Sequence, residues 1–290
     1  MIFRSLKRLF VAGLATFRNT TPSNNYGSSV APSHLLRNMT TSCFRVRPKI
    51  ILFGDSLTQQ GFGVDGSVGW AGLLSQAYTR RADVFNRGFS GYNTRHCIEL
   101  IPRVFGDDTN QQDVLFCTVF LGANDAALPG ERQHVPIDEY ETNLGTIVTE
   151  MRKRLGSQAN ILLLTPPPVD EEPWRAFREI PKSDRTNEVA KSYGDRVKQV
   201  GRQHNCPVVD TWDLLKGYAA PSDVSGGYSQ YLSDGLHLNE DGQRLIYEGI
   251  MKVIQDKLPD CKPMADDDGE GRYGTKGGVP LEEKLWSEIC

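Results

Sequence analysis

From Lys49 onward, short apolar runs alternate along the chain with longer amphipathic segments. Each run is nearly continuous in Ile, Leu, Val and Phe, a pattern typical of strands that are buried on both faces of a parallel sheet. The runs predict five strands, at residues 49–53, 83–86, 114–121, 161–165 and 207–210.

The segments between these runs have the length and spacing of amphipathic helices. They predict helices at residues 70–81, 95–105, 137–155, 185–204 and 240–258. Strands and helices that alternate in this way indicate a three-layer α/β fold, in which a doubly wound, mostly parallel five-stranded sheet lies between two layers of helices. Such sheets bind ligands at the carboxyl ends of their strands, so we expect the chemistry there.

The same pattern divides the chain into three parts. Residues 49–258 form one predicted domain. Residues 1–48 are basic, rich in Ser, Thr and Asn, and carry apolar residues at near-helical spacing, which is typical of a transit peptide for mitochondria or another organelle. A disordered basic extension on a cytoplasmic protein is the alternative. Residues 259–290 are rich in Asp, Gly and Lys without periodicity, and predict a flexible tail.

Composition and charge narrow the classes of function. The 290 residues are 39% hydrophobic and include 28 glycines, as in proteins with a packed core. The net charge is −3, although residues 1–50 contain eight Lys/Arg and no Asp or Glu, so the remainder carries −11. An acidic body argues against nucleic-acid binding, which needs a basic face. No run approaches about 18 consecutive apolar residues, so stable membrane insertion is not expected.

Neither the cysteines nor the histidines point to a metal or cofactor. The six cysteines are scattered without a CxxC pair, which indicates reduced structural thiols and neither a disulfide framework nor a zinc site. The five histidines include no HExxH motif and no pair at i, i+4, so metal catalysis is not expected. The sequence leaves the oligomeric state open.

A serine stands just after the first predicted strand, in the segment GDSLT at residues 54–58. Where a strand turns sharply toward a helix, such a serine can offer both its hydroxyl and its backbone N–H to one ligand. The segment makes Ser56 a candidate catalytic residue, and an ordinary turn or helix cap is the alternative.

An aspartate and a histidine precede the last predicted helix, in the segment DGLH at residues 234–237. A serine hydroxyl is a weak nucleophile until a base takes its proton, and a carboxylate on the other ring nitrogen holds that base in one tautomer. Asp234 and His237 can make this contact across the glycine and leave Nε2 free to face Ser56. A surface turn with an incidental histidine is the alternative.

Two further segments follow the second and third predicted strands, NRGFSGYNT at residues 86–94 and LGAND at residues 121–125. An oxyanion needs donors without bulk, and a glycine N–H with an asparagine amide supplies them. Two ordinary turns would explain each segment alone. Four compatible signals in order at successive strand ends are much harder to attribute to chance.

The four blocks, which supply Ser, Gly, Asn and His, resemble the GDSL or SGNH hydrolases. The resemblance is closer still to the isoamyl acetate-hydrolysing esterase group, in the phrases NRGFSGYNTR (86–95), FLGAND (120–125) and YLSDGLHL (231–238). It covers about residues 49–258 with all four blocks intact.

This resemblance implies the SGNH, flavodoxin-like fold and a serine esterase that hydrolyses small esters, such as acetates of short alcohols, through an acyl-enzyme and without a cofactor. It implies Ser56 as the nucleophile, the Asp234/His237 pair as the base, and Ser56, Gly91 and Asn124 as the oxyanion donors.

Three other functions are considered. An acyltransferase would share every catalytic residue, and a binding module would share the fold, although no site residue is lost here. The segment GFGVDG at residues 61–66 matches the dinucleotide pattern GxGxxG, but it lies beyond the strand-to-helix turn that those glycines must form, which disfavours an NAD- or FAD-dependent oxidoreductase. Trp70 and Phe62 could line an acyl pocket, and core packing is the simpler expectation for Trp70.

Overall fold

The computed structural model describes residues 47–106, 113–217 and 228–263. The expected transit-like segment therefore lies outside the described residues, apart from its last two positions, and so does the predicted tail beyond residue 263. All described residues belong to one compact unit, Phe44–Cys290.

A five-stranded sheet forms the centre of this unit, and its strand order is β2-β1-β3-β4-β5. All four neighbouring pairs are parallel. Because the order reverses between β2 and β3, the chain winds in both directions from β1, which confirms the predicted doubly wound sheet. The strands are β1 (Lys49–Gly54), β2 (Asp83–Gly88), β3 (Val114–Phe120), β4 (Ile161–Leu164) and β5 (Val208–Val209).

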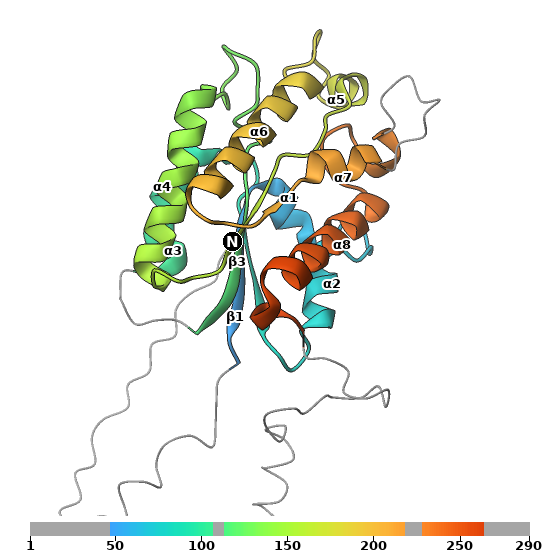
Figure 1. Cartoon of the computed structure of the whole chain (residues 1–290). Coiled ribbons are helices and arrows are strands. Elements are labelled where there is room, and N and C mark those ends of the chain that lie inside the picture. Colours follow the sequence, from blue (N-terminus) through green and yellow to red (C-terminus); the bar gives the residue numbers. More distant parts are fainter. Residues whose placement is uncertain (1–46, 107–112, 218–227, 264–290) are drawn as a thin grey trace, which may run out of the picture. The chain divides into compact units, whose positions relative to one another are not determined.

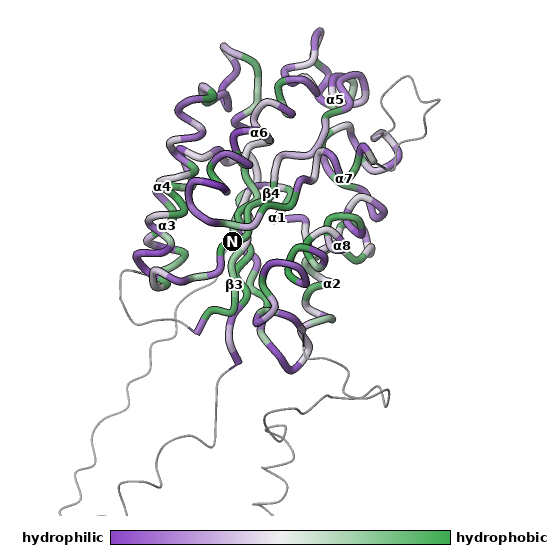
Figure 2. The backbone as a smooth tube through the Cα atoms, in the orientation of Figure 1, coloured by the Kyte–Doolittle hydropathy of each residue, from purple (hydrophilic) through white to green (hydrophobic). Residues whose placement is uncertain are grey.

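Helices cover both faces of the sheet, which confirms the three layers (Figure 1). One face carries α3 (Thr94–Phe105), α4 (Ile137–Leu155) and α6 (Asn187–Gln203), and the other carries α2 (Trp70–Ala77), α7 (Thr211–Gly217) and α8 (Glu240–Lys257). Alternate strand residues point to the two faces and build two apolar cores. Figure 2 shows the hydrophobic strands at the centre and the hydrophilic helix surfaces outside.

The structure adds short elements that the sequence pattern does not predict. They are α1 (Ser56–Gln59), α5 (Glu171–Phe177), α7, and the 3-10 turns η1 (Gln60–Phe62), η2 (Ser229–Tyr231) and η3 (Pro259–Cys261). None of them exceeds two turns of helix, so none can display the i, i+3, i+4, i+7 repeat on which the prediction depends. The predicted helix 70–81 also ends earlier, at Ala77, and the turn that follows contains Arg80 with a left-handed φ of 66°.

The ordered domain continues past its predicted end at residue 258. Pro259 begins η3 and does not begin a tail, and Cys261 is 1% exposed and packs into the apolar core. The buried hydroxyl of Tyr78 donates to the Cys261 carbonyl at 2.7 Å. The described residues contain no helix that is long and apolar enough to cross a membrane.

Candidate active site

Ser56 is the first residue of α1, at the carboxyl end of β1, an interior strand of the sheet. Its side chain is held in a buried turn and only 5% of the residue is exposed. Asp55 caps α1 by accepting the Leu57 N–H at 2.9 Å. Gly54 is required before this turn, because a Cβ there would lie 2.4 Å from the Phe120 carbonyl oxygen.

His237 and Asp234 lie in the loop that precedes α8. Asp234 Oδ2 lies 2.6 Å from His237 Nδ1, and His237 Nε2 lies 2.9 Å from Ser56 Oγ. Asp234 Oδ1 also accepts the backbone N–H groups of Leu236 and His237 at 2.9 and 2.8 Å. Burial raises the pKa of Asp234, but the hydrogen bonds from the His237 ring and the two N–H groups outweigh burial and hold its pKa below the ordinary value.

The short helix α5 supports this loop. The Asp170 N–H, at the start of α5, donates to the Gly235 carbonyl at 2.8 Å. Gly235 has a φ of 95°, and a Cβ there would lie 2.4 Å from the backbone nitrogen of Trp174. The Trp174 ring meets the His237 ring edge-on, with centroids 6.0 Å apart. This contact restricts the position of the His237 ring. It comes from α5, a helix that the sequence pattern does not predict.

Gly91 and Asn124, the predicted oxyanion donors, lie in the turns after β2 and β3. Asn124 is 4% exposed, and its Nδ2 donates to the carbonyl of Tyr92, the residue that follows Gly91, at 2.8 Å. The Gly91 turn is joined to the Ser56 turn, because the Phe89 N–H donates to the Gly54 carbonyl at 2.8 Å. The structure thus brings all five predicted site residues to the carboxyl edge of the sheet.

Two small pockets border Gly91, with volumes of about 280 and 240 Å³. The first is lined by Gly91, Glu131, Arg132, Gln133, Arg178 and Asp184. The second is lined by Ser90, Gly91, Tyr92, His96, Arg132 and Gln133. The first pocket is therefore walled mainly by polar and charged side chains, whereas the Tyr92 and His96 rings contribute apolar surface to the second.

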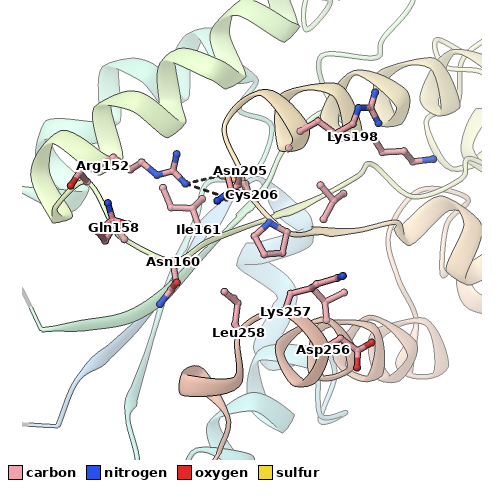
Figure 3. A pocket seen from close by; sticks show the side chains of 17 residues that line it. Arg152, Gln158, Asn160, Ile161, Lys198, Asn205, Cys206, Asp256, Lys257 and Leu258 are labelled. Atoms are coloured by element: carbon pink, nitrogen blue, oxygen red, sulfur yellow. Dashed lines mark hydrogen bonds between the residues drawn. The ribbon is translucent and has the colours of Figure 1, made fainter.

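A cleft of about 820 Å³ opens at the other edge of the sheet, where β4 and β5 begin (Figure 3). Two of its basic side chains have protein partners, since Arg152 donates to the His204 carbonyl at 2.6 Å and Lys198 pairs with Asp210. The cleft contains none of the predicted site residues.

The structure also shows where the other residues singled out in the sequence lie. Trp70 is fully buried in the core, as expected, whereas Phe62 is 45% exposed. The glycine-rich segment 61–66 lies in η1 and the loop after it, away from any strand-to-helix turn. Four cysteines in the described ranges are buried free thiols. Those ranges also hold no group of three or more side chains arranged to bind a metal.

The fold and the hydrogen-bonded serine, histidine and aspartate are those of a hydrolase, and comparison with known proteins gives the family. The GDSL-like lipase/acylhydrolase family model matches residues 52–245, so the chain belongs to this family.

Two relatives and one solved structure illustrate the match. An isoamyl acetate-hydrolyzing esterase 1 homolog of Mus musculus is 36% identical over 215 residues, which cover 73% of this chain and 83% of that one. A GDSL esterase/lipase of Arabidopsis thaliana is 37% identical over 232 residues, 77% of this chain and 92% of that one. The crystal structure of a lipase/acylhydrolase from Enterococcus faecalis superposes with a TM-score of 0.54 at 26% identity, over 72% and 96% of the two chains. The chain is therefore a carboxylic ester hydrolase, as the resemblance implied.

Proposed function

We propose that this esterase hydrolyses short-chain, acetyl-type carboxylic esters through an acyl-enzyme on Ser56. The observation that carries the proposal is the continuous chain of hydrogen bonds from Ser56 Oγ through the His237 ring to Asp234 Oδ2. It joins a nucleophile, a base and an orienting carboxylate in the geometry that activates a serine.

In the first half of the reaction, Ser56 Oγ attacks the ester carbonyl carbon while His237 Nε2 takes the hydroxyl proton. Asp234 stabilises the resulting imidazolium through Nδ1–H. The tetrahedral intermediate then collapses, the bond to the alcohol oxygen breaks, and Nε2 gives its proton to that oxygen. In the second half, water repeats these steps against the acyl-enzyme and releases the acid.

The negative oxygen of the tetrahedral intermediate requires donors, and three groups are suited to it. Ser56 is the first residue of α1, and the first N–H groups of a helix have no acceptor within the helix. The Gly91 N–H and the second hydrogen of Asn124 Nδ2 complete the set. Removal of one such donor typically lowers kcat by about 10²–10³.

The preference for short acyl chains is supported by the surroundings of Gly91. The two pockets beside it are small, about 280 and 240 Å³, and both are bordered by Arg132 and Gln133, so they offer little apolar wall to a long acyl chain. Each acyl methylene that finds no apolar wall loses about 0.8 kcal/mol of binding. Relatives that carry the name of an isoamyl acetate-hydrolyzing esterase agree with an acetyl-type substrate.

The proposal is tested by comparing Ser56→Ala with the wild type on p-nitrophenyl acetate. We expect kcat to fall at least about 10³-fold without loss of folding, and a fluorophosphonate to label the wild type at Ser56. Ser75→Ala, a matched change at an exposed serine of α2, should keep full activity. Near-normal turnover by Ser56→Ala would refute the acyl-enzyme. Ester formed from an added alcohol, in place of free acid, would instead identify an acyltransferase.

A further inference from the structure

The Asn124 side chain can serve an oxyanion only if its amide has the right end toward the substrate. An amide carries donors on its nitrogen and acceptors on its oxygen, and the two ends have nearly the same shape. If the amide turned over, Oδ1 would face the negative oxygen of the intermediate and repel it. Some neighbouring group must therefore fix the orientation of this side chain.

Arg185 provides a fixed reference for that orientation. It is 1% exposed, and its guanidinium donates to the Ala123 carbonyl at 3.0 Å and to Asp184 Oδ1 at 2.8 Å. It lies over the Trp174 ring, 5.1 Å from the ring centroid. An arginine side chain has only donors, so any polar atom that it contacts must be an acceptor.

Two amide oxygens face this guanidinium. Arg185 Nη2 lies 2.6 Å from Gln133 Oε1 and 3.3 Å from Asn124 Oδ1. Once Oε1 of Gln133 faces the arginine, its Nε2 faces the other way, where it donates to both Asn124 Oδ1 and the Gly91 carbonyl at 2.9 Å. Asn124 Oδ1 thus receives donors from both residues, and its Nδ2 is turned toward the Tyr92 carbonyl and the site.

We propose that Gln133, itself oriented by Arg185, is a positioning residue that fixes the donor end of Asn124 toward the substrate and joins it to the Gly91 turn. The inference rests on the proposed oxyanion role of Asn124. Gln133 touches no reacting atom, and it acts by holding the two oxyanion donors in one arrangement before substrate arrives. The donor that faces the oxyanion is also strengthened, because hydrogen bonds to the amide oxygen polarise the amide.

Gln133→Glu tests the inference with almost no change of shape. The new side chain can keep an acceptor toward Arg185, but it places a second acceptor against Asn124 Oδ1 and the Gly91 carbonyl. Asn124 Oδ1 then meets an acceptor in place of the Gln133 donor while the Arg185 donor remains, so neither orientation of the amide satisfies both neighbours and its donor end is no longer fixed toward the substrate. We expect kcat on p-nitrophenyl acetate to fall about 10- to 100-fold with KM changed less than about 2-fold, a loss specific to the transition state. Gln158→Glu, at the opposite edge of the sheet, is the matched control and should leave kcat unchanged.

A double-mutant cycle separates positioning from a general effect of charge or stability. In the Asn124→Ala background only the contact of Gln133 with the Gly91 carbonyl remains, so Gln133→Glu should lower kcat several-fold less than it does in the wild type. Gln133→Met, which removes the donor without adding charge, should show the same dependence on Asn124 and serves if Gln133→Glu does not fold.

The possible failures are distinguishable. If Asn124→Ala alone leaves kcat unchanged, the oxyanion assignment in the proposed function is wrong. If Asn124→Ala lowers kcat but the Gln133 variants do not, or if they lower kcat equally in both backgrounds, the positioning role of Gln133 is wrong and the esterase mechanism stands.

Discussion

Two buried carboxyl groups lie next to residues of the site in the sequence. Asp55 precedes Ser56, Asp125 follows Asn124, and both are 0% exposed. In each, Oδ1 accepts a backbone N–H, whereas Oδ2 has no partner among the described residues. Burial raises the pKa of Asp55 to about 7 and that of Asp125 to about 6, and the charge of Asp125 further raises the pKa of Asp55.

Asp55→Asn should therefore change how stability depends on pH. The folded-state pKa of Asp55, about 7, lies above the ordinary value of 3.8, so the folded protein holds this proton more tightly than the unfolded chain. The stabilisation is complete below about pH 4 and is lost as the pH rises to about 7. Asn keeps the cap acceptor and does not ionise. The wild type should lose unfolding free energy relative to Asp55→Asn over this range, on the order of 1.4 kcal/mol for each pH unit.

Urea unfolding of both proteins between pH 4 and 8 measures this difference. Asp65→Asn is the matched control at an exposed aspartate and should show a nearly constant offset from the wild type. A constant offset for Asp55→Asn would mean that the Asp55 carboxyl ionises as easily in the folded protein as in the unfolded chain.

Some residues of the site could be predicted from the sequence and others could not. Ser56, Asp234 and His237 could be predicted because strand ends in a parallel sheet converge, and because the Asp-His contact spans only three residues. Gln133 and Arg185 gave no signal, since their partners are side chains far away in sequence and nothing local marks them. Their roles depend on tertiary contacts that only the folded chain creates.

At the scale of elements, length decided what could be predicted. Helix α4 was predicted with its observed bounds, because nineteen residues hold several repeats of an amphipathic pattern. Helix α5, with seven residues, holds too few, although its Trp174 supports the His237 loop. The sequence predicts a tail from residue 259, because a proline follows α8 and the segment after it is polar without periodicity. A single buried residue, Cys261, is too little to change that pattern.

Truncation after Leu258 should consequently destabilise the domain, whereas truncation after Pro263 should not. The shorter chain loses Cys261 from the core and leaves the buried Tyr78 hydroxyl without its acceptor, which costs about 1–3 kcal/mol. We expect Tm to fall by roughly 2–12 °C relative to the longer truncation, as measured by thermal unfolding. The fall should be smaller in a Tyr78→Phe background, which lacks the orphaned hydroxyl. Equal Tm values for the two truncations would show that η3 contributes nothing to stability.

At the scale of the whole molecule, the two edges of the sheet differ in what they present. The carboxyl edge gathers the serine, the histidine and the proposed oxyanion donors, as the doubly wound topology predicts. The amino edge carries the cleft, in which Arg152 and Lys198 are bound by groups of the protein itself. The family expected from the sequence is confirmed, and the predicted site residues lie together at the carboxyl edge. Organelle targeting by residues 1–48 stays a prediction, because it depends on a receptor and not on the fold.

The small volumes of the two pockets beside Gly91, about 280 and 240 Å³, set the expected substrate range. With p-nitrophenyl esters of two to twelve carbons, kcat/KM should peak at about two to six carbons, because longer chains gain no apolar wall to offset the cost of ordering them. Arg132 lines both pockets beside Gly91, so Arg132→Leu should move the optimum toward longer chains. Arg103→Leu, at an exposed position on α3, should not move it. A wild-type preference for twelve carbons or more would show that the acyl chain occupies an apolar channel elsewhere and that the pockets beside Gly91 do not set the chain length.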